Sequence, residues 1–231
     1  FPWFVINIFF WIIPALLMAF LGAFFFFRKI ISGNLLYAIL SGVIFTTNTY
    51  FLIVFFGGQQ GVLLAYSFIP LVFLTFINLL KKTNFYRSIL FGLILSLQLL
   101  FDPRFFLMTL GGVILFYFLR FEFLKKHLIF IALIPISILL LLHAYWIIPI
   151  ILFKPALLPE GHGSIESLRF FSFAFFENSL SLIHPNWPEN IFGKVSFMKP
   201  EFLIIPILAF GSLLFIKKAK SRIEQYSNRT I

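Results

Sequence analysis

Long uninterrupted runs of apolar residues constrain this chain more than any other feature of its sequence. Phe24–Phe27 is four phenylalanines in a row, and Ile138–Leu142 is five aliphatic residues. Such runs lack the alternation of apolar and polar residues that strands of a membrane β-barrel need. Phenylalanine and isoleucine favour strands in water, but a lipid-embedded backbone must satisfy its own hydrogen bonds, which favours helices. The sequence therefore predicts an all-α, polytopic transmembrane helix bundle.

About 20 consecutive apolar residues cross a bilayer as a helix. By this criterion we expect about seven spans, and we assign all of residues 1–231 to one bundle. The predicted spans are residues 3–27, 35–56, 62–80, 88–101, 105–119, 128–153 and 202–216. Residues 154–200 are predicted to form an external loop, in which residues 165–176 lie as an amphipathic helix in the outer membrane interface. Because the chain starts at Phe1 with an apolar run and no signal peptide, we expect it to be a fragment of a longer protein.

The composition excludes several other classes of protein. Hydrophobic residues make up 61% of the chain and charged residues 11%, whereas a soluble domain is about half apolar and a quarter charged. The formal net charge is +10, but no soluble face exists to carry a basic stripe, so we expect no nucleic acid as a partner. Since the chain has no cysteine, thiol catalysis and thiolate metal sites are also excluded. The partner that this composition predicts is membrane lipid.

The distribution of lysine and arginine predicts the orientation in the membrane. Residues 88–101 and 105–119 are short for spans, so they could form one kinked helix or a hairpin of two helices. The hairpin places 13 of the 18 basic residues on one side, and the positive-inside rule makes that side the cytoplasm. We therefore predict a hairpin, in a protein of the cytoplasmic membrane with its N-terminus outside and its C-terminus in the cytoplasm.

The triplet Asp102-Pro103-Arg104, between these two short spans, is the first candidate site. Aspartate is a good N-cap and proline is favoured at the first helical position, so the triplet could simply start the next helix. However, the flanking spans of 14 and 15 residues measure about 21–23 Å, less than the hydrocarbon core of about 30 Å. We therefore expect the turn to lie below the outer surface, where an ionisable pair is a candidate functional site. A guanidinium beside helix N–H groups would suit a phosphate.

Other polar residues lie within the predicted spans. His143, with Tyr145 and Trp146 close by, lies in the span of residues 128–153. It could donate a hydrogen bond to a neighbouring helix or contact a ligand. The polar belt Thr46–Tyr50 could likewise form hydrogen bonds between helices or line a cavity.

The external loop holds the remaining candidate residues, Glu160, His162, His184 and Trp187. Glu160 and His162 are two residues apart and could share a metal ion. No third ligand is specified, so we assign no metal site, and a divalent metal stays open as a cofactor. Trp187 lies between prolines, as expected of a loop at the level of the lipid headgroups.

Several short motifs follow one another in a distinctive order: Gly33–Ala38, Asn48–Tyr50, Gly57–Gly61, Ala65-Tyr66, Ile69–Leu71, Asp102–Arg104, and Trp146 with Pro149. With this order and spacing, residues 10–200 resemble the middle region of multispanning membrane proteins of the GT-C glycosyltransferase architecture. The resemblance is to the large archaeal and bacterial members of that type.

The resemblance implies an enzyme that transfers a sugar from a polyprenyl-phosphate donor at the external membrane face. The catalytic acid of such enzymes lies in the first external loop, which would precede Phe1, so no catalytic residue is assigned here. What would remain is an outer cavity in which Arg104 meets the lipid phosphate, with Asp102, Tyr66 and His143 in its wall. Two other functions stay open: a transporter or flippase built from proline-broken helices, and a non-catalytic scaffold whose external loop docks partners.

Overall fold

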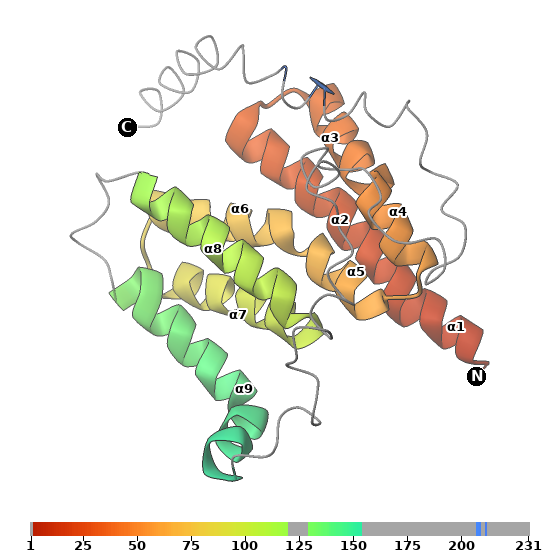
Figure 1. Cartoon of the computed structure of the whole chain (residues 1–231). Coiled ribbons are helices and arrows are strands. Elements are labelled where there is room, and N and C mark those ends of the chain that lie inside the picture. The colour runs from red at the N-terminus through yellow and green to blue at the C-terminus, as the bar shows by residue number, and fades with distance from the viewer. Residues whose placement is uncertain (1, 120–128, 154–206, 209–210, 212–231) are drawn as a thin grey trace. The chain divides into compact units, whose positions relative to one another are not determined.

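The computed structural model of the chain describes residues 2–119, 129–153, 207–208 and 211 (Figure 1). Within these ranges the chain is helical and contains no strand, which confirms the predicted all-α class. The described helices within residues 2–47 and 54–153 belong to one compact unit, whereas Asn48–Ile53 and residues 207–208 and 211 are assigned to a second. The single bundle of residues 1–231 stays a prediction, as do the seventh span, the external loop and its amphipathic helix, which lie almost entirely outside the described residues.

Among the described residues, three helical segments are long and apolar enough to cross a membrane: Val5–Ile31, Gln60–Lys81 and Ile129–Leu152. Leu35–Thr47 and Tyr50–Phe56 pass the same test together as one broken span. In chain order the elements are α1 (Trp3–Asn7), η1 (Ile8–Ile12), α2 (Ile13–Phe26), η2 (Phe27–Ile31), α3 (Leu35–Thr47), α4 (Thr49–Phe56), α5 (Gln60–Ser67), α6 (Ile69–Lys81), α7 (Phe85–Phe101), α8 (Pro103–Leu119), η4 (Ile129–Leu133) and α9 (Ile134–Phe153).

Prolines lie at or beside several junctions between these elements. The π-helical turns η1 and η4 each end two residues before a proline, Pro14 and Pro135. Proline has no N–H and its ring clashes with the carbonyl one turn earlier, so a wider turn accommodates it within a continuing helix. Pro70 follows the break between α5 and α6, and Pro103 opens α8. Proline therefore explains much of how the long helices are subdivided.

The helices α7 and α8 form the predicted hairpin, with Asp102 between them. Near the end of α7, the amide Nε2 of Gln98 donates to Oγ1 of Thr109 in α8 at 2.9 Å and to the carbonyl oxygen of Ala65 in α5 at 3.0 Å. Each helix of the hairpin has 17 residues, or about 25 Å, which is longer than predicted because α7 starts at Phe85 and α8 at Pro103. The turn at Asp102 therefore need not lie as deep as the sequence suggested.

A buried hydrophobic core lies between α6, α7 and α8, and Phe76 is at its centre. The ring of Phe76 lies 5.3 Å from that of Phe91 and 6.3 Å from that of Phe116, measured between centroids. Glycines allow other helices to approach closely, since a Cβ on Gly22 would lie 3.1 Å from Leu71. Small residues at helix contacts are typical of membrane bundles. The buried members of the core are Val72, Phe76, Leu79, Leu80, Phe91, Leu95, Phe106 and Val113.

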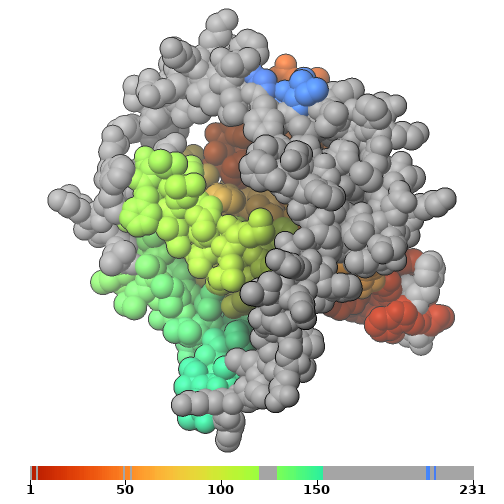
Figure 2. Space-filling view, in the orientation of Figure 1, coloured from red at the N-terminus to blue at the C-terminus, as the bar shows by residue number. Residues whose placement is uncertain are grey.

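The outer surfaces of α8 and α9 are strongly apolar. Met108 in α8 is 71% exposed and Leu141 in α9 is 76% exposed, and many neighbouring leucines and isoleucines are similarly accessible. Side chains of both helices appear on the face that Figure 2 shows. Soluble monomers rarely expose large contiguous apolar patches, so this surface fits contact with lipid.

Candidate functional site

The turn between α7 and α8 is built around the side chain of Asp102. Its Oδ1 accepts the backbone N–H of Arg104 at 2.8 Å and that of Phe105 at 3.2 Å, which satisfies two donors at the start of α8. Asp102 is thus the N-cap of this helix, and the interpretation of the triplet as a helix start is confirmed. The same carboxylate also forms an ion pair.

Arg104 folds back onto Asp102. Its Nη2 donates to Oδ2 at 2.7 Å, and its Nε donates to both carboxylate oxygens at 3.2 Å. Burial alone would raise the pKa of Asp102, but the hydrogen bonds from the Arg104 side chain and the Phe105 backbone, with the nearby charge, hold the pKa below its usual value. Asp102 is therefore ionised at neutral pH. The carboxylate is buried, whereas the side chain of Arg104 is 73% exposed, so the turn presents a guanidinium at the surface.

A second polar cluster ties α9 to α7 through His143, which is only 2% exposed. Nε1 of Trp146 donates to Nδ1 of His143 at 2.9 Å. Nε2 of His143 lies 3.1 Å from the carbonyl oxygen of Ser96 and 2.9 Å from its hydroxyl. This is the hydrogen bond to a neighbouring helix that the sequence suggested for His143.

These contacts assign a donor or acceptor role to each ring nitrogen of His143. An indole N–H can only donate and a carbonyl oxygen can only accept, so Nδ1 of His143 carries no proton and Nε2 carries one. Since Nε2 already holds a proton, it cannot remove the proton of the Ser96 hydroxyl, and the pair is not arranged as a nucleophile with its general base.

A cavity of about 280 Å³ lies where α7 ends, α8 begins and α9 passes. Its wall consists of Leu99, Leu100, Pro103, His143, Tyr145 and Trp146. The cavity thus brings the imidazole cluster next to Pro103, the central residue of the Asp102–Arg104 turn. It is mostly apolar, with polar groups from α9 at one side.

The lining of this cavity overlaps with the predicted cavity wall at one residue. Of the four residues proposed for it, His143 lines this cavity, whereas Asp102, Arg104 and Tyr66 do not. The ring of Tyr66 instead stacks on Phe45, with centroids 4.7 Å apart, and lies edge-on to Phe105 at 5.9 Å. Aromatic packing thus places Tyr66 in a different environment from His143.

Sequence reasoning missed Ser96 and Gln98, although two polar residues in an apolar span are a readable signal. Gln98 is fully buried, and its Oε1 has no hydrogen-bond partner among the described residues. The polar belt does not form the suggested bonds between helices through the hydroxyl protons of Thr46 and Thr47. Their hydroxyls donate to carbonyl oxygens one turn earlier in α3, including that of Val43, and not to another helix.

The remaining predicted site residues, Glu160, His162, His184 and Trp187, lie outside the described residues. Within residues 2–119 and 129–153, no group of three histidine, aspartate or glutamate side chains is placed to hold a metal ion. The described part of the chain therefore assigns no residue to a metal cofactor.

Comparison of the chain with protein-family models, with curated proteins and with solved structures finds no match. The resemblance to GT-C transferases thus rests on the order of the short motifs alone.

Proposed function

We propose that this chain spans the cytoplasmic membrane seven times, with its N-terminus outside and its C-terminus in the cytoplasm. Three helices of 22 residues or more support insertion, because about 20 apolar residues cross the hydrocarbon core. The 17-residue helices α7 and α8 are at the lower limit for a span.

The separation of charge between the two ends of the helices supports this orientation. Trp11 contacts Phe101, with ring centroids 6.2 Å apart, and a Cβ on Gly61 would lie 3.1 Å from the Phe101 carbonyl oxygen. Trp11 in η1 and the start of α5 therefore lie beside the tip of the hairpin. The basic residues Arg28, Lys29, Lys81, Lys82 and Arg87 come about 20–30 Å further along their helices, measured from Trp11, Gly61 or Phe101.

Arg104 lies at the hairpin tip, and it is the one basic residue of the described part at that end. The positive-inside rule makes the opposite end, with five lysines and arginines, the cytoplasmic one. The Asp102–Arg104 turn and the cavity beside it then face the outside of the cell.

We further propose that the chain is part of a GT-C-like glycosyltransferase that uses a polyprenyl-phosphate sugar donor at the external face. The observation that carries this proposal is an apolar cavity whose wall includes Pro103, the residue that precedes Arg104, together with the exposed Arg104 side chain. An amphiphilic donor needs both, since its isoprenoid segment must leave water while its phosphate needs hydrogen-bond donors.

Each residue of the site has a distinct role in this proposal. Asp102 orients the guanidinium of Arg104, which binds the donor phosphate and stabilises it as it leaves. Leu99 and Leu100 contact the isoprenoid segment, and His143 holds Trp146 in place at the cavity wall. A carboxylate of the first external loop, which the resemblance places outside this chain, removes the proton of the acceptor hydroxyl. Nothing in the described ranges favours the transporter or the scaffold instead.

The test offers radiolabelled polyprenyl-phosphate sugar to the full-length protein and measures transfer to acceptor. We expect Arg104→Gln to lower kcat/KM about 10- to 100-fold, because a hydrogen bond to a charged group contributes about 1.5–3 kcal/mol. Arg104→Lys should lose less activity, since it keeps the charge.

Gly111→Ala is the matched control, because a Cβ at Gly111 meets no atom within 4 Å. Absence of transfer by the wild type, together with no effect of removing the acidic residues of the first external loop, would refute the proposal.

A further inference from the structure

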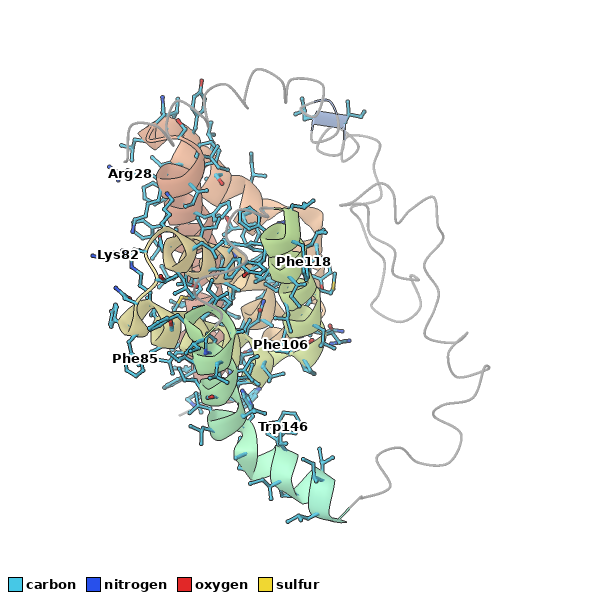
Figure 3. The ribbon with its side chains drawn as sticks, turned by 90° about the vertical axis from the view of Figure 1, so that its left-hand side faces the viewer. Arg28, Lys82, Phe85, Phe106, Phe118 and Trp146 are labelled. Carbon is cyan, nitrogen blue, oxygen red and sulfur yellow. The ribbon has the colours of Figure 1, made fainter. Side chains whose placement is uncertain are left out.

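The end of the helices opposite the Asp102–Arg104 turn carries a group of cations, which we call the basic end: Arg28, Lys29, Lys81, Lys82 and Arg87. In Figure 3, Arg28 and Lys82 lie along the same edge of the ribbon, together with Phe85. Arg28, Lys29, Lys81 and Lys82 are exposed. The basic end is thus an accessible surface of one sign of charge.

No acidic side chain of the described residues balances these cations. Asp102 is the one acidic residue in the described part of the chain, and it forms an ion pair with Arg104 at the other end. Arg87 is partly used inside the protein, since its Nη1 donates to the carbonyl oxygen of Asn78 at the end of α6. The side chains of Lys81 and Lys82 make no such hydrogen bond within the described residues.

Exposed aromatic side chains lie close to the cations in the sequence. Tyr37 near the start of α3 is 54% exposed, and Phe85 and Tyr86 at the start of α7 are 62% and 72% exposed. Arg28 lies over the ring of Phe24, 5.8 Å from its centroid, and Lys29 lies 5.5 Å from that of Phe25. Aromatic residues mixed with lysine and arginine are characteristic of the level of the lipid headgroups.

We propose that the basic end binds anionic phospholipid headgroups, with Lys81 and Lys82 at the α6–α7 turn as the main contacts. The charge complementarity favours this partner, because the surface carries cations without acidic neighbours in the described ranges, and a polybasic segment at a membrane attracts anionic lipid. Exposed tyrosine and phenylalanine near these cations in the sequence fit a position at the level of the headgroups. The proposal rests on membrane insertion and does not depend on sugar transfer.

The experiment titrates the purified full chain with phosphatidylglycerol or phosphatidylcholine and counts bound lipids by native mass spectrometry. We expect the wild type to bind phosphatidylglycerol more tightly than phosphatidylcholine, and this preference to shrink in 0.5 M salt. Lys81→Gln with Lys82→Gln should weaken phosphatidylglycerol binding about fivefold for each lysine removed, the equivalent of about 1 kcal/mol per cation.

Two control variants separate charge from shape. Lys81→Arg with Lys82→Arg keeps the charge and should keep the affinity, and Thr83→Ala should change nothing. The proposal would be overturned if the wild type bound phosphatidylglycerol and phosphatidylcholine with equal affinity. It would also be overturned if the double glutamine variant lost affinity for both lipids to the same extent.

Soluble polyglutamate serves as a competing anion. If it bound the basic end more tightly than vesicles of phosphatidylglycerol, the partner would be an acidic protein and not lipid. A negative result in any of these arms leaves the transfer assay unaffected, so the two proposals fail separately.

Discussion

The contact between α7 and α9 depends on Gly92, and adding one methyl group there tests how closely the two helices pack. A Cβ on Gly92 would lie 3.0 Å from the Cα of Pro135, which is backbone and cannot rotate away, and 3.1 Å from Cδ1 of Ile138. Replacing glycine by alanine in a helix gains about 1 kcal/mol. Overpacking a closely packed site costs about 1–3 kcal/mol. Gly92→Ala should therefore leave stability unchanged or lower it by up to about 2 kcal/mol.

Gly111→Ala provides the matched comparison. It makes the same chemical change in α8, at a position where a Cβ meets no atom within 4 Å, so only the gain in helix propensity applies. Unfolding of both variants in detergent, followed by circular dichroism, should place Gly111→Ala about 1–3 kcal/mol above Gly92→Ala. Equal stabilities for the two variants would refute the close approach of α9 to α7.

Two further predictions concern the polar clusters. Asp102→Ala should cost about 1 kcal/mol through loss of the cap of α8, whereas Asp102→Asn should cost only a few tenths because asparagine also caps. The pKa of Asp102 is lowered by folding from 3.8, so its contribution is complete above that pH and is lost as the pH falls through the lower value. Acid unfolding below about pH 4 should therefore be less steep in Asp102→Asn. A double-mutant cycle of His143→Leu with Trp146→Phe should give a coupling of about 0.6–1 kcal/mol in detergent unfolding, and additive losses would contradict the Trp146–His143 bond.

The helices themselves could be predicted from the sequence, because their signals are local. The run of apolar residues sets the class, and Asp102 followed by Pro103 marks both the end of α7 and the cap of α8. The start of α7 was less predictable. The helix begins at Phe85, three residues before the apolar run suggests, because Asn84 accepts the backbone N–H of Arg87 and so caps it.

The partners of the polar side chains could not be predicted, because they depend on which face of an apolar helix meets a neighbour. The segment around His143 is apolar on every side, so its periodicity does not indicate where α7 lies. The resemblance to GT-C transferases implied that Tyr66 lies in the cavity wall. In the structure its ring packs between Phe45 and Phe105. Ser96 and Gln98 are evident in the sequence as polar residues of an apolar span. Their hydrogen-bond partners follow only from the packing of α5, α7, α8 and α9.

The π-helical turns before Pro14 and Pro135 have a consequence for comparing this chain with others. A turn of this kind holds about one more residue than an α-helical turn, so the side chains that follow it are rotated by about 100° relative to an uninterrupted helix. The buried positions Ala15, Ala19 and Ala23 recur every four residues in α2. This spacing therefore does not continue through η1 towards the N-terminus. An alignment of this chain with a relative lacking either proline should place a one-residue gap within η1 or η4.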